Sequence, residues 1–172
     1  MSIFLIGYMG SGKSILGKQA SIDLQRPFWD LDDMIQEKLN LSIFEIFNQK
    51  GEDFFRKIEH EILIKHNFES DAIIATGGGT PCFFDNHNFM KSIGHTIYLK
   101  VSSDELCKRL QNIDNRPLLF NNKLNLNQFI QDNLSYRDNS YSESNFTLES
   151  DNILAEELSD LIRKIKYEEN TD

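Results

Sequence analysis

The feature that most constrains this chain is a glycine-rich run that lies between an apolar segment and a segment of helical spacing. Residues 7–14 read GYMGSGKS and fit the pattern G-x-x-x-x-G-K-[ST] at each fixed position. Glycines let backbone N–H groups converge on phosphate oxygens, and the following helix presents its positive end to the same anion. Lys13 would reach the β- and γ-phosphates, and the Ser14 hydroxyl would bind Mg²⁺. A plain glycine-rich turn is the alternative, but the context favours a nucleotide site.

A phosphate-binding loop of this kind occurs in GTPases, motor ATPases and small kinases alike. The guanine-specifying pattern N-K-x-D is absent from the sequence, since residues 122–125 read NKLN and lack the acid that would pair with guanine. With 172 residues in all, the chain leaves little length for motor or helicase modules after the loop. A small kinase is therefore favoured by elimination.

Length and charge narrow the class of protein further. A chain of 172 residues suits one domain, and 40% apolar and 26% charged residues are ordinary for a soluble globular protein. A net charge of −9 would repel nucleic-acid phosphates, and the sequence shows no strong basic patch. No apolar run approaches the roughly 18 residues that cross a bilayer, and a strand-like run follows Met1 directly. We expect a cytoplasmic protein without nucleic-acid or membrane partners, with Cys82 and Cys107 reduced.

Short apolar runs alternate with longer segments of helical spacing. Five runs have strand length, the second and the last of them weaker: 3–6, 27–29, 72–75, 96–101 and 145–148. One helical stripe begins near Gly51 and includes Phe55 and Ile62, and another runs from Leu154 to Ile165. This alternation predicts an α/β fold, with helices on both faces of a parallel sheet. Ligands of such sheets bind at the carboxyl ends of the strands.

One segment interrupts the alternation. Residues 112–127 are rich in asparagine, contain Arg116 and Pro117, and join two helical stretches. A connection of that length in a compact domain is usually a lid or a disordered excursion. A lid at about residues 112–125 would bring Arg116 onto the transferring phosphoryl group on closure. Taken alone, an isolated arginine is more often a solvated charge.

Two aspartates lie where the second strand run ends. Asp30 and Asp32 are two residues apart, so in extended chain both carboxylates would point toward the site beyond the strand. One acid could hold Mg²⁺ through water, and the other could accept the proton of the acceptor hydroxyl. The alternative is that Asp32 or Asp33 merely caps the following helix.

A charged pair and a glycine triplet complete the candidate acceptor site. Arg56 and Glu59 are three apart on a predicted helix and are therefore neighbours. A guanidinium held by a carboxylate is well shaped to clamp a substrate carboxylate, although a weak surface ion pair has the same spacing. Residues 77–79 are all glycine and could let a ligand lie against bare backbone, although a floppy turn would use the same residues.

Taken in this order, the motifs resemble those of shikimate kinases, from residue 3 to about residue 162. The resemblance rests on Gly7–Ser14, Asp30-x-Asp32, Phe55-Arg56-x-x-Glu59, Gly77–Gly79, Arg116-Pro117-Leu118 and Arg137. It implies ATP-dependent phosphorylation of shikimate to shikimate 3-phosphate, in chorismate and aromatic amino-acid biosynthesis. It also implies a monomeric single kinase domain over residues 1–172, with a three-layer α/β/α P-loop NTPase fold, a five-stranded parallel sheet of order 2-3-1-4-5, a lid, and a substrate-binding helical segment at about residues 31–62.

The resemblance further implies roles for individual residues. The catalytic residues would be Lys13, Asp32 and Arg116. ATP would be bound by Gly10, Ser11, Gly12, Lys13, Ser14, Ile15, Arg109 beside the adenine, and Arg116. Mg²⁺ would be held by Ser14 and, through water, by Asp30. Shikimate would be bound by Asp32, Phe47, Phe55, Arg56, Glu59, Gly77, Gly78, Gly79 and Arg137. Within this set, Arg56 and Arg137 would grip the carboxylate while Glu59 orients Arg56.

The sequence departs from the family pattern near the adenine site, where residues 149–152 read ESDN and members often carry a second basic residue. The candidate lid also holds only Lys123 beyond Arg116. Two other functions stay open. A gluconate-type or nucleoside-monophosphate kinase would keep Lys13 and Arg116 without needing the other motifs together. A catalytically silent ATP-binding module would be expected to have lost at least one reactive group.

Overall fold

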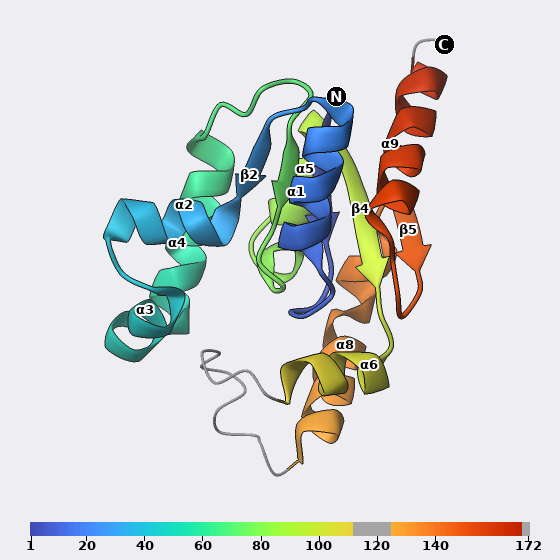
Figure 1. The fold of residues 1–172 in the computed structure, drawn as a ribbon. Coiled ribbons are helices and arrows are strands. Elements are labelled where there is room, and N and C mark those ends of the chain that lie inside the picture. The colour runs from blue at the N-terminus through green and yellow to red at the C-terminus, as the bar shows by residue number, and fades with distance from the viewer. Residues whose placement is uncertain (112–124, 170–172) are drawn as a thin grey trace.

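A five-stranded parallel sheet forms the centre of the molecule (Figure 1). The structure is a computed structural model that describes residues 1–111 and 125–169. The strands are β1 (Ser2–Ile6), β2 (Phe28–Asp30), β3 (Ile73–Ala75), β4 (Gly94–Lys100) and β5 (Phe146–Glu149). They pair in the order β2-β3-β1-β4-β5, with each pair parallel. The five predicted strand runs and the predicted order are therefore confirmed.

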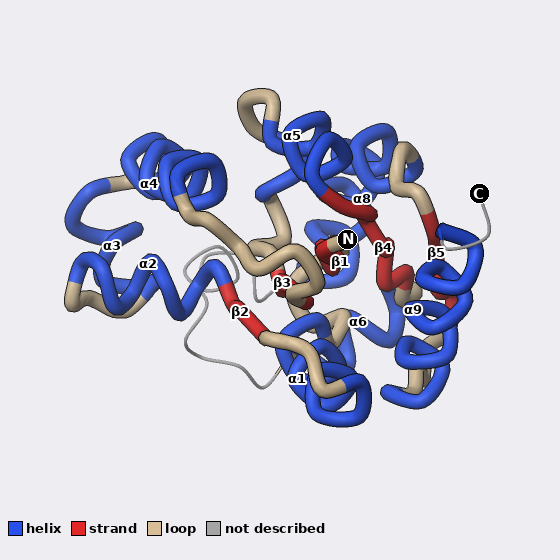
Figure 2. Tube along the Cα trace, turned by 90° about the horizontal axis from the view of Figure 1, so that it is seen from above, coloured by secondary structure: helices blue, strands red, loops and turns tan. Residues whose placement is uncertain are grey.

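Helices cover both faces of the sheet. They are α1 (Lys13–Leu24), α2 (Leu31–Leu39), α3 (Ile43–Lys50), α4 (Glu52–Lys65), α5 (Asn86–Ile93), α6 (Ser103–Leu110), α8 (Leu126–Ser142) and α9 (Ala155–Glu169), with a 3₁₀ turn η1 (Thr80–Cys82). Figure 2 shows α1 and α9 on one side of the sheet and α4 and α5 on the other. The three-layer α/β/α architecture is confirmed.

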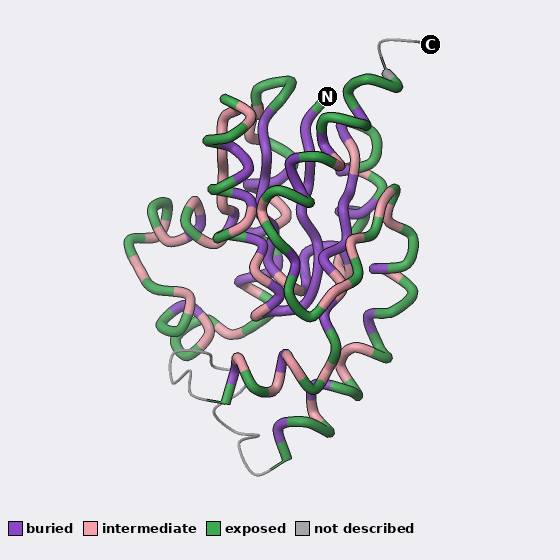
Figure 3. Tube along the Cα trace, turned by 45° about the vertical axis from the view of Figure 1, so that its right-hand side comes forward, coloured by how far each residue is buried: buried purple, intermediate pink, exposed green. Residues whose placement is uncertain are grey.

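The central strand β1 is buried on both of its faces, which is why it reads as an unbroken apolar run. Ile3 and Leu5 point into one core with residues of α1 and α9, whereas Phe4 and Ile6 point into a second core with residues of α2 to α5. Burying one such side chain stabilises the fold by roughly 1.5–3 kcal/mol. Figure 3 shows the buried strands inside a shell of helices whose outer faces are exposed.

The last helix begins later than its predicted apolar stripe. Leu154 lies before α9 with 51% of its surface exposed, and its backbone N–H donates to the Glu157 carboxylate at 2.7 Å. Leu158 and Ile165 of the predicted stripe are buried, together with Ile162, and Leu161 is partly buried against the same core. Leu154 is therefore wrong as a core position, because a residue in the helix-entry turn does not follow the helical period.

Part of the predicted lid cannot be compared with the structure, since residues 112–124, including Arg116, lie outside the described residues. Asn125 directly precedes α8. Among the residues that are described, no helix has both the length and the apolar character needed to cross a membrane.

Candidate active site

The phosphate loop joins β1 to α1 and depends on glycine geometry. Gly7, Gly10 and Gly12 have φ angles of 144°, 83° and 98°, in the region that favours glycine. The Lys13 ammonium is turned inward and donates to the carbonyls of Gly7 and Tyr8 at 2.8 and 2.9 Å. The loop thus holds a buried cation at the amino end of α1, where a phosphate would bind.

The two candidate metal ligands are in direct contact. The Ser14 hydroxyl donates to Asp30 Oδ2 at 2.5 Å. Hydroxyl and carboxylate oxygens are ligands that Mg²⁺ prefers, and they lie here beside the amino end of α1. This donor set fits a magnesium ion.

The two aspartates do not continue the strand together. Asp30 is the last residue of β2, and α2 begins at Leu31. Asp30 caps this helix, since its Oδ1 accepts from the Asp32 N–H at 2.9 Å. The predicted extended geometry is therefore wrong, because the helical turn separates the carboxylates. Asp30 faces the phosphate loop, and Asp32 lines the neighbouring pocket.

A pocket that is open to solvent lies beside the phosphate loop. It is lined by Met9, Asp32, Ile43, Phe47, Phe55, Arg56, Gly77, Gly78, Gly79 and Arg137. Every residue predicted to bind the acceptor lines it except Glu59, which lies behind Arg56. Phe47 and Phe55 pack as a tilted pair with ring centroids 4.7 Å apart and form an apolar wall. No sequence signal identifies Met9 and Ile43, which are apolar residues at ordinary loop and helix positions.

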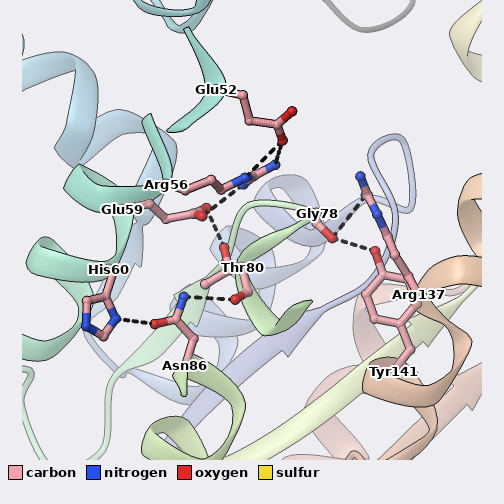
Figure 4. A network of polar contacts seen from close by, with 9 residues as sticks. All are labelled: Glu52, Arg56, Glu59, His60, Gly78, Thr80, Asn86, Arg137 and Tyr141. Carbon is pink, nitrogen blue, oxygen red and sulfur yellow. Dashed lines mark hydrogen bonds and ion pairs between the residues drawn. The ribbon is translucent and has the colours of Figure 1, made fainter. Parts of the chain in front are cut away.

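Arg56 and Glu59 form a buried ion pair on α4. Arg56 is 5% exposed and Glu59 is fully buried, with Arg56 Nη1 donating to Glu59 Oε2 at 2.9 Å (Figure 4). Arg56 Nε and Nη2 donate to a second carboxylate, that of Glu52, at 3.2 and 3.0 Å. The guanidinium also lies 4.5 Å from the centroid of the Phe83 ring. Arg56 and Glu59 therefore form a buried ion pair, and not the weak surface ion pair that has the same sequence spacing.

The glycine triplet after β3 serves close approach by the protein's own side chains. A Cβ at Gly79 would lie 2.5 Å from Arg56 Nη2, and one at Gly77 would overlap the Glu59 carboxylate. Backbone hydrogen bonds from Thr80 N–H to Gly77 O (3.1 Å) and from Cys82 N–H to Gly79 O (2.8 Å) give the turn a defined geometry. The triplet is thus shaped around the charged pair as well as the pocket.

The second arginine reaches the same loop from α8. Arg137 is 6% exposed, and its Nη1 donates to Gly78 O at 3.3 Å. Tyr141 donates its hydroxyl to the same carbonyl at 2.5 Å, and burial raises the pKa of that hydroxyl above its ordinary value, so it stays a donor. The Arg137 guanidinium also lies 5.1 Å from the centroid of the Tyr8 ring. Tyr8 and Tyr141 are functional neighbours that sequence reasoning missed, although Tyr141 follows Arg137 at helical i,i+4 spacing.

Arg109 lies where α6, the phosphate loop and the turn after β5 meet. It donates to Gly10 O at 3.0 Å, to Asp151 O at 2.6 Å and to the Glu105 carboxylate at 2.9 Å. The segment 149–152 thus contacts a basic side chain from α6 rather than carrying one. Ile15, another predicted nucleotide contact, is 68% exposed beside Ser14 and Asp30.

The phosphate loop and a separate pocket with buried cations both lie beside the carboxyl ends of β1 to β3. This arrangement is that of a P-loop kinase that acts on small molecules. A family model described as shikimate kinase matches residues 9–166. This chain belongs to the shikimate kinase family.

Individual relatives agree with this assignment. The shikimate kinase of Parabacteroides distasonis is 40% identical over 156 residues, which cover 90% of each chain. That of Flavobacterium psychrophilum is 41% identical over 169 residues, covering 96% of this chain and 98% of the relative. A solved shikimate kinase of Acinetobacter baumannii, in complex with shikimate, has a TM-score of 0.83 at 33% identity and covers 95% of this chain and 89% of its own. A gluconokinase of Sinorhizobium meliloti, at 13% identity and a TM-score of 0.52, shares the fold alone.

Proposed function

We propose that this chain transfers the γ-phosphate of ATP to a hydroxyl of shikimate, forming ADP and shikimate 3-phosphate for chorismate and aromatic amino-acid biosynthesis. The observation that carries the proposal is the placement of Arg56, Arg137 and Asp32 in one pocket beside the phosphate loop. Two buried guanidinium groups suit an acceptor that carries a carboxylate, and a carboxylate beside them suits its hydroxyls. The solved relative with bound shikimate supports this choice of acceptor.

The acceptor would be held by its carboxylate between Arg56 and Arg137, with Glu59 orienting Arg56. Asp32 would accept a hydrogen bond from the reacting hydroxyl and take its proton as the phosphoryl group arrives. Backbone groups of residues 77–79 would border the same molecule. The apolar wall of Phe47 and Phe55 would exclude water from the ring face of the acceptor.

On the donor side, Lys13 would exchange the carbonyls of Gly7 and Tyr8 for phosphate oxygens. Ser14 and Asp30 would hold Mg²⁺, which neutralises phosphate charge when bound. Arg109 would lie beside the adenine, and Arg116 would add positive charge at the transferring group. The protein's contribution would be positioning and electrostatic stabilisation rather than covalent chemistry.

We further propose that residues 1–172 act as one kinase domain, as a monomer in the cytoplasm. The interleaving of all five strands in one sheet supports a single domain, since β1 lies between β3 and β4. Sedimentation of the purified chain at the mass of one copy is the expected result, and a stable dimer would contradict it.

The proposed function is tested by ADP release from Mg·ATP with shikimate, gluconate, AMP or no acceptor. We expect stimulation by shikimate alone, with shikimate 3-phosphate identified by mass. Stimulation by gluconate or AMP instead would reassign the pocket, and equal slow ADP release under all four conditions would contradict an acceptor kinase.

Loss of the Ser14 hydroxyl should weaken the use of magnesium. We expect Ser14→Ala to raise the Mg²⁺ concentration for half-maximal activity by about tenfold or more, because even indirect partners of a metal commonly contribute that much. The control is Ser21→Ala on the same helix, whose hydroxyl donates to the Lys18 carbonyl at 2.8 Å. An unchanged Mg²⁺ dependence in Ser14→Ala would remove this residue from the metal site.

A further inference from the structure

The Glu59 carboxylate that orients Arg56 is itself held by a hydroxyl from the loop after β3. Thr80 is fully buried, and its Oγ1 donates to Glu59 Oε1 at 2.6 Å. The other oxygen of the same carboxylate, Oε2, accepts from Arg56 Nη1 at 2.9 Å. The hydroxyl and the guanidinium thus bond to different oxygens of a fully buried carboxylate.

Thr80 is also positioned by contacts of its backbone. Its carbonyl accepts from Asn86 Nδ2 at 2.9 Å, and Asn86 Oδ1 lies 2.6 Å from His60 Nδ1. Glu59 and His60 are consecutive on α4, so the loop is tied to this helix at both positions (Figure 4). The His60 ring also stacks on Phe84, with centroids 4.6 Å apart. The loop therefore stays anchored through Asn86 when the Thr80 hydroxyl is removed.

The Thr80 hydroxyl affects how the Glu59 carboxylate bonds to the Arg56 guanidinium. A carboxylate with no other donor can offer both oxygens to one guanidinium, the bidentate geometry that such pairs favour. That geometry would draw Arg56 toward Glu59 and away from the pocket wall. The guanidinium is closely packed, since a Cβ at Gly79 would lie 2.5 Å from Arg56 Nη2. A small rotation would therefore change which N–H groups it presents to the pocket.

We propose that Thr80 is a positioning residue for the acceptor carboxylate: its hydroxyl occupies one oxygen of Glu59 and so keeps the Arg56 guanidinium facing the pocket. Thr80 does not touch the acceptor in this role. This role rests on the proposed function, which assigns Arg56 to a bound carboxylate. Thr80 is not among the residues that line the acceptor pocket.

The test compares Thr80→Val, which removes the hydroxyl at nearly constant shape, with Thr80→Ser, which restores it. We expect Thr80→Val to raise KM for shikimate about tenfold, the effect of a hydrogen bond to a charged group, with kcat and KM for ATP within about twofold of the parent. Thr80→Ser should return KM toward the parent value. The matched control is Thr96→Val, which removes another fully buried hydroxyl, bonded to Asn145 Oδ1 at 3.0 Å on β4.

A second measurement does not depend on the identity of the acceptor. The ¹⁵Nε–¹H NMR signal of Arg56, assigned with Arg56→Lys, should have a different chemical shift in Thr80→Val than in the parent or in Thr96→Val. Failure of the parent to phosphorylate shikimate would contradict the proposed function, and this signal would still test the positioning of Arg56.

Two results would overturn the positioning role. One is an Arg56 signal in Thr80→Val that is unchanged from the parent. The other is a Thr80→Val protein whose Tm falls as in Thr96→Val while KM for shikimate stays at the parent value, because the hydroxyl would then serve stability alone.

Discussion

Asp32→Asn lowers kcat for shikimate phosphorylation by about 100-fold or more, the usual range for a lost general base, while KM for shikimate changes only severalfold. The amide keeps the shape of the carboxylate and can still bond to the acceptor, so binding is largely kept. What it loses is the ability to take the hydroxyl proton. The side chain is placed for that role, since Asp32 lines the pocket and a Cβ at Gly77 would lie 3.4 Å from its Oδ1.

The control for this substitution is Asp53→Asn, which removes the same charge from an exposed position in the first turn of α4. Steady-state kinetics at saturating ATP should place Asp53→Asn within about twofold of the parent, as expected for an exposed charge. If Asp32→Asn kept the parent kcat and raised only KM, Asp32 would be a binding group, and the proton would have to leave by another route.

The sheet could be predicted because its strands are buried on both faces. Phe4 and Leu5 are consecutive, yet they point into different cores, so the whole strand must be apolar and stands out in the sequence. The phosphate loop could be predicted for a related reason: its function is performed by backbone and by adjacent residues. Its glycines at 7, 10 and 12 mark the positions of positive φ.

The acceptor site could be predicted only in part, because its residues come from separate elements. Arg56 and Glu59 lie on one helix and their pairing follows from spacing alone. The contact between Glu59 and Thr80 joins α4 to the loop after β3, and nothing in the local pattern of either segment predicts it. Tyr141 is similar, since its hydroxyl meets a carbonyl 63 positions away in the chain.

The position of the glycine triplet at the pocket can be predicted from the sequence, but only part of the reason for glycine there can be. Three consecutive glycines at residues 77–79 suggest a ligand beside bare backbone, and these residues do line the pocket. The structure adds that Gly77 and Gly79 face Glu59 and Arg56, which lie too close to admit a Cβ. Packing of this kind depends on the tertiary approach of α4 to the loop, so sequence spacing cannot reveal it.

Arg56→Lys should raise KM for shikimate by about 10- to 100-fold, with a smaller change in kcat and none in KM for ATP. Lysine keeps the positive charge beside Glu59, so the buried carboxylate is not left unpaired, as it would be in Arg56→Ala at a cost of about 3–5 kcal/mol. What lysine lacks is the planar fork of donors. Arg56 uses that fork to bond Glu59 and Glu52 at once, with further N–H groups to offer an acceptor.

The exposed Arg163 provides the matched control, because it also bonds two carboxylates, those of Asp23 and Asp160, but lies on α9. Arg163→Lys should leave both KM values unchanged. The methyl ester of shikimate sharpens the test, since it has no carboxylate for Arg56 to grip. If the guanidinium binds that carboxylate, Arg56→Lys costs little further activity toward the ester, and the two losses are strongly non-additive. Equal losses toward shikimate and its ester would place the effect of Arg56 elsewhere in the pocket, and the carboxylate would then have to be held by Arg137 alone.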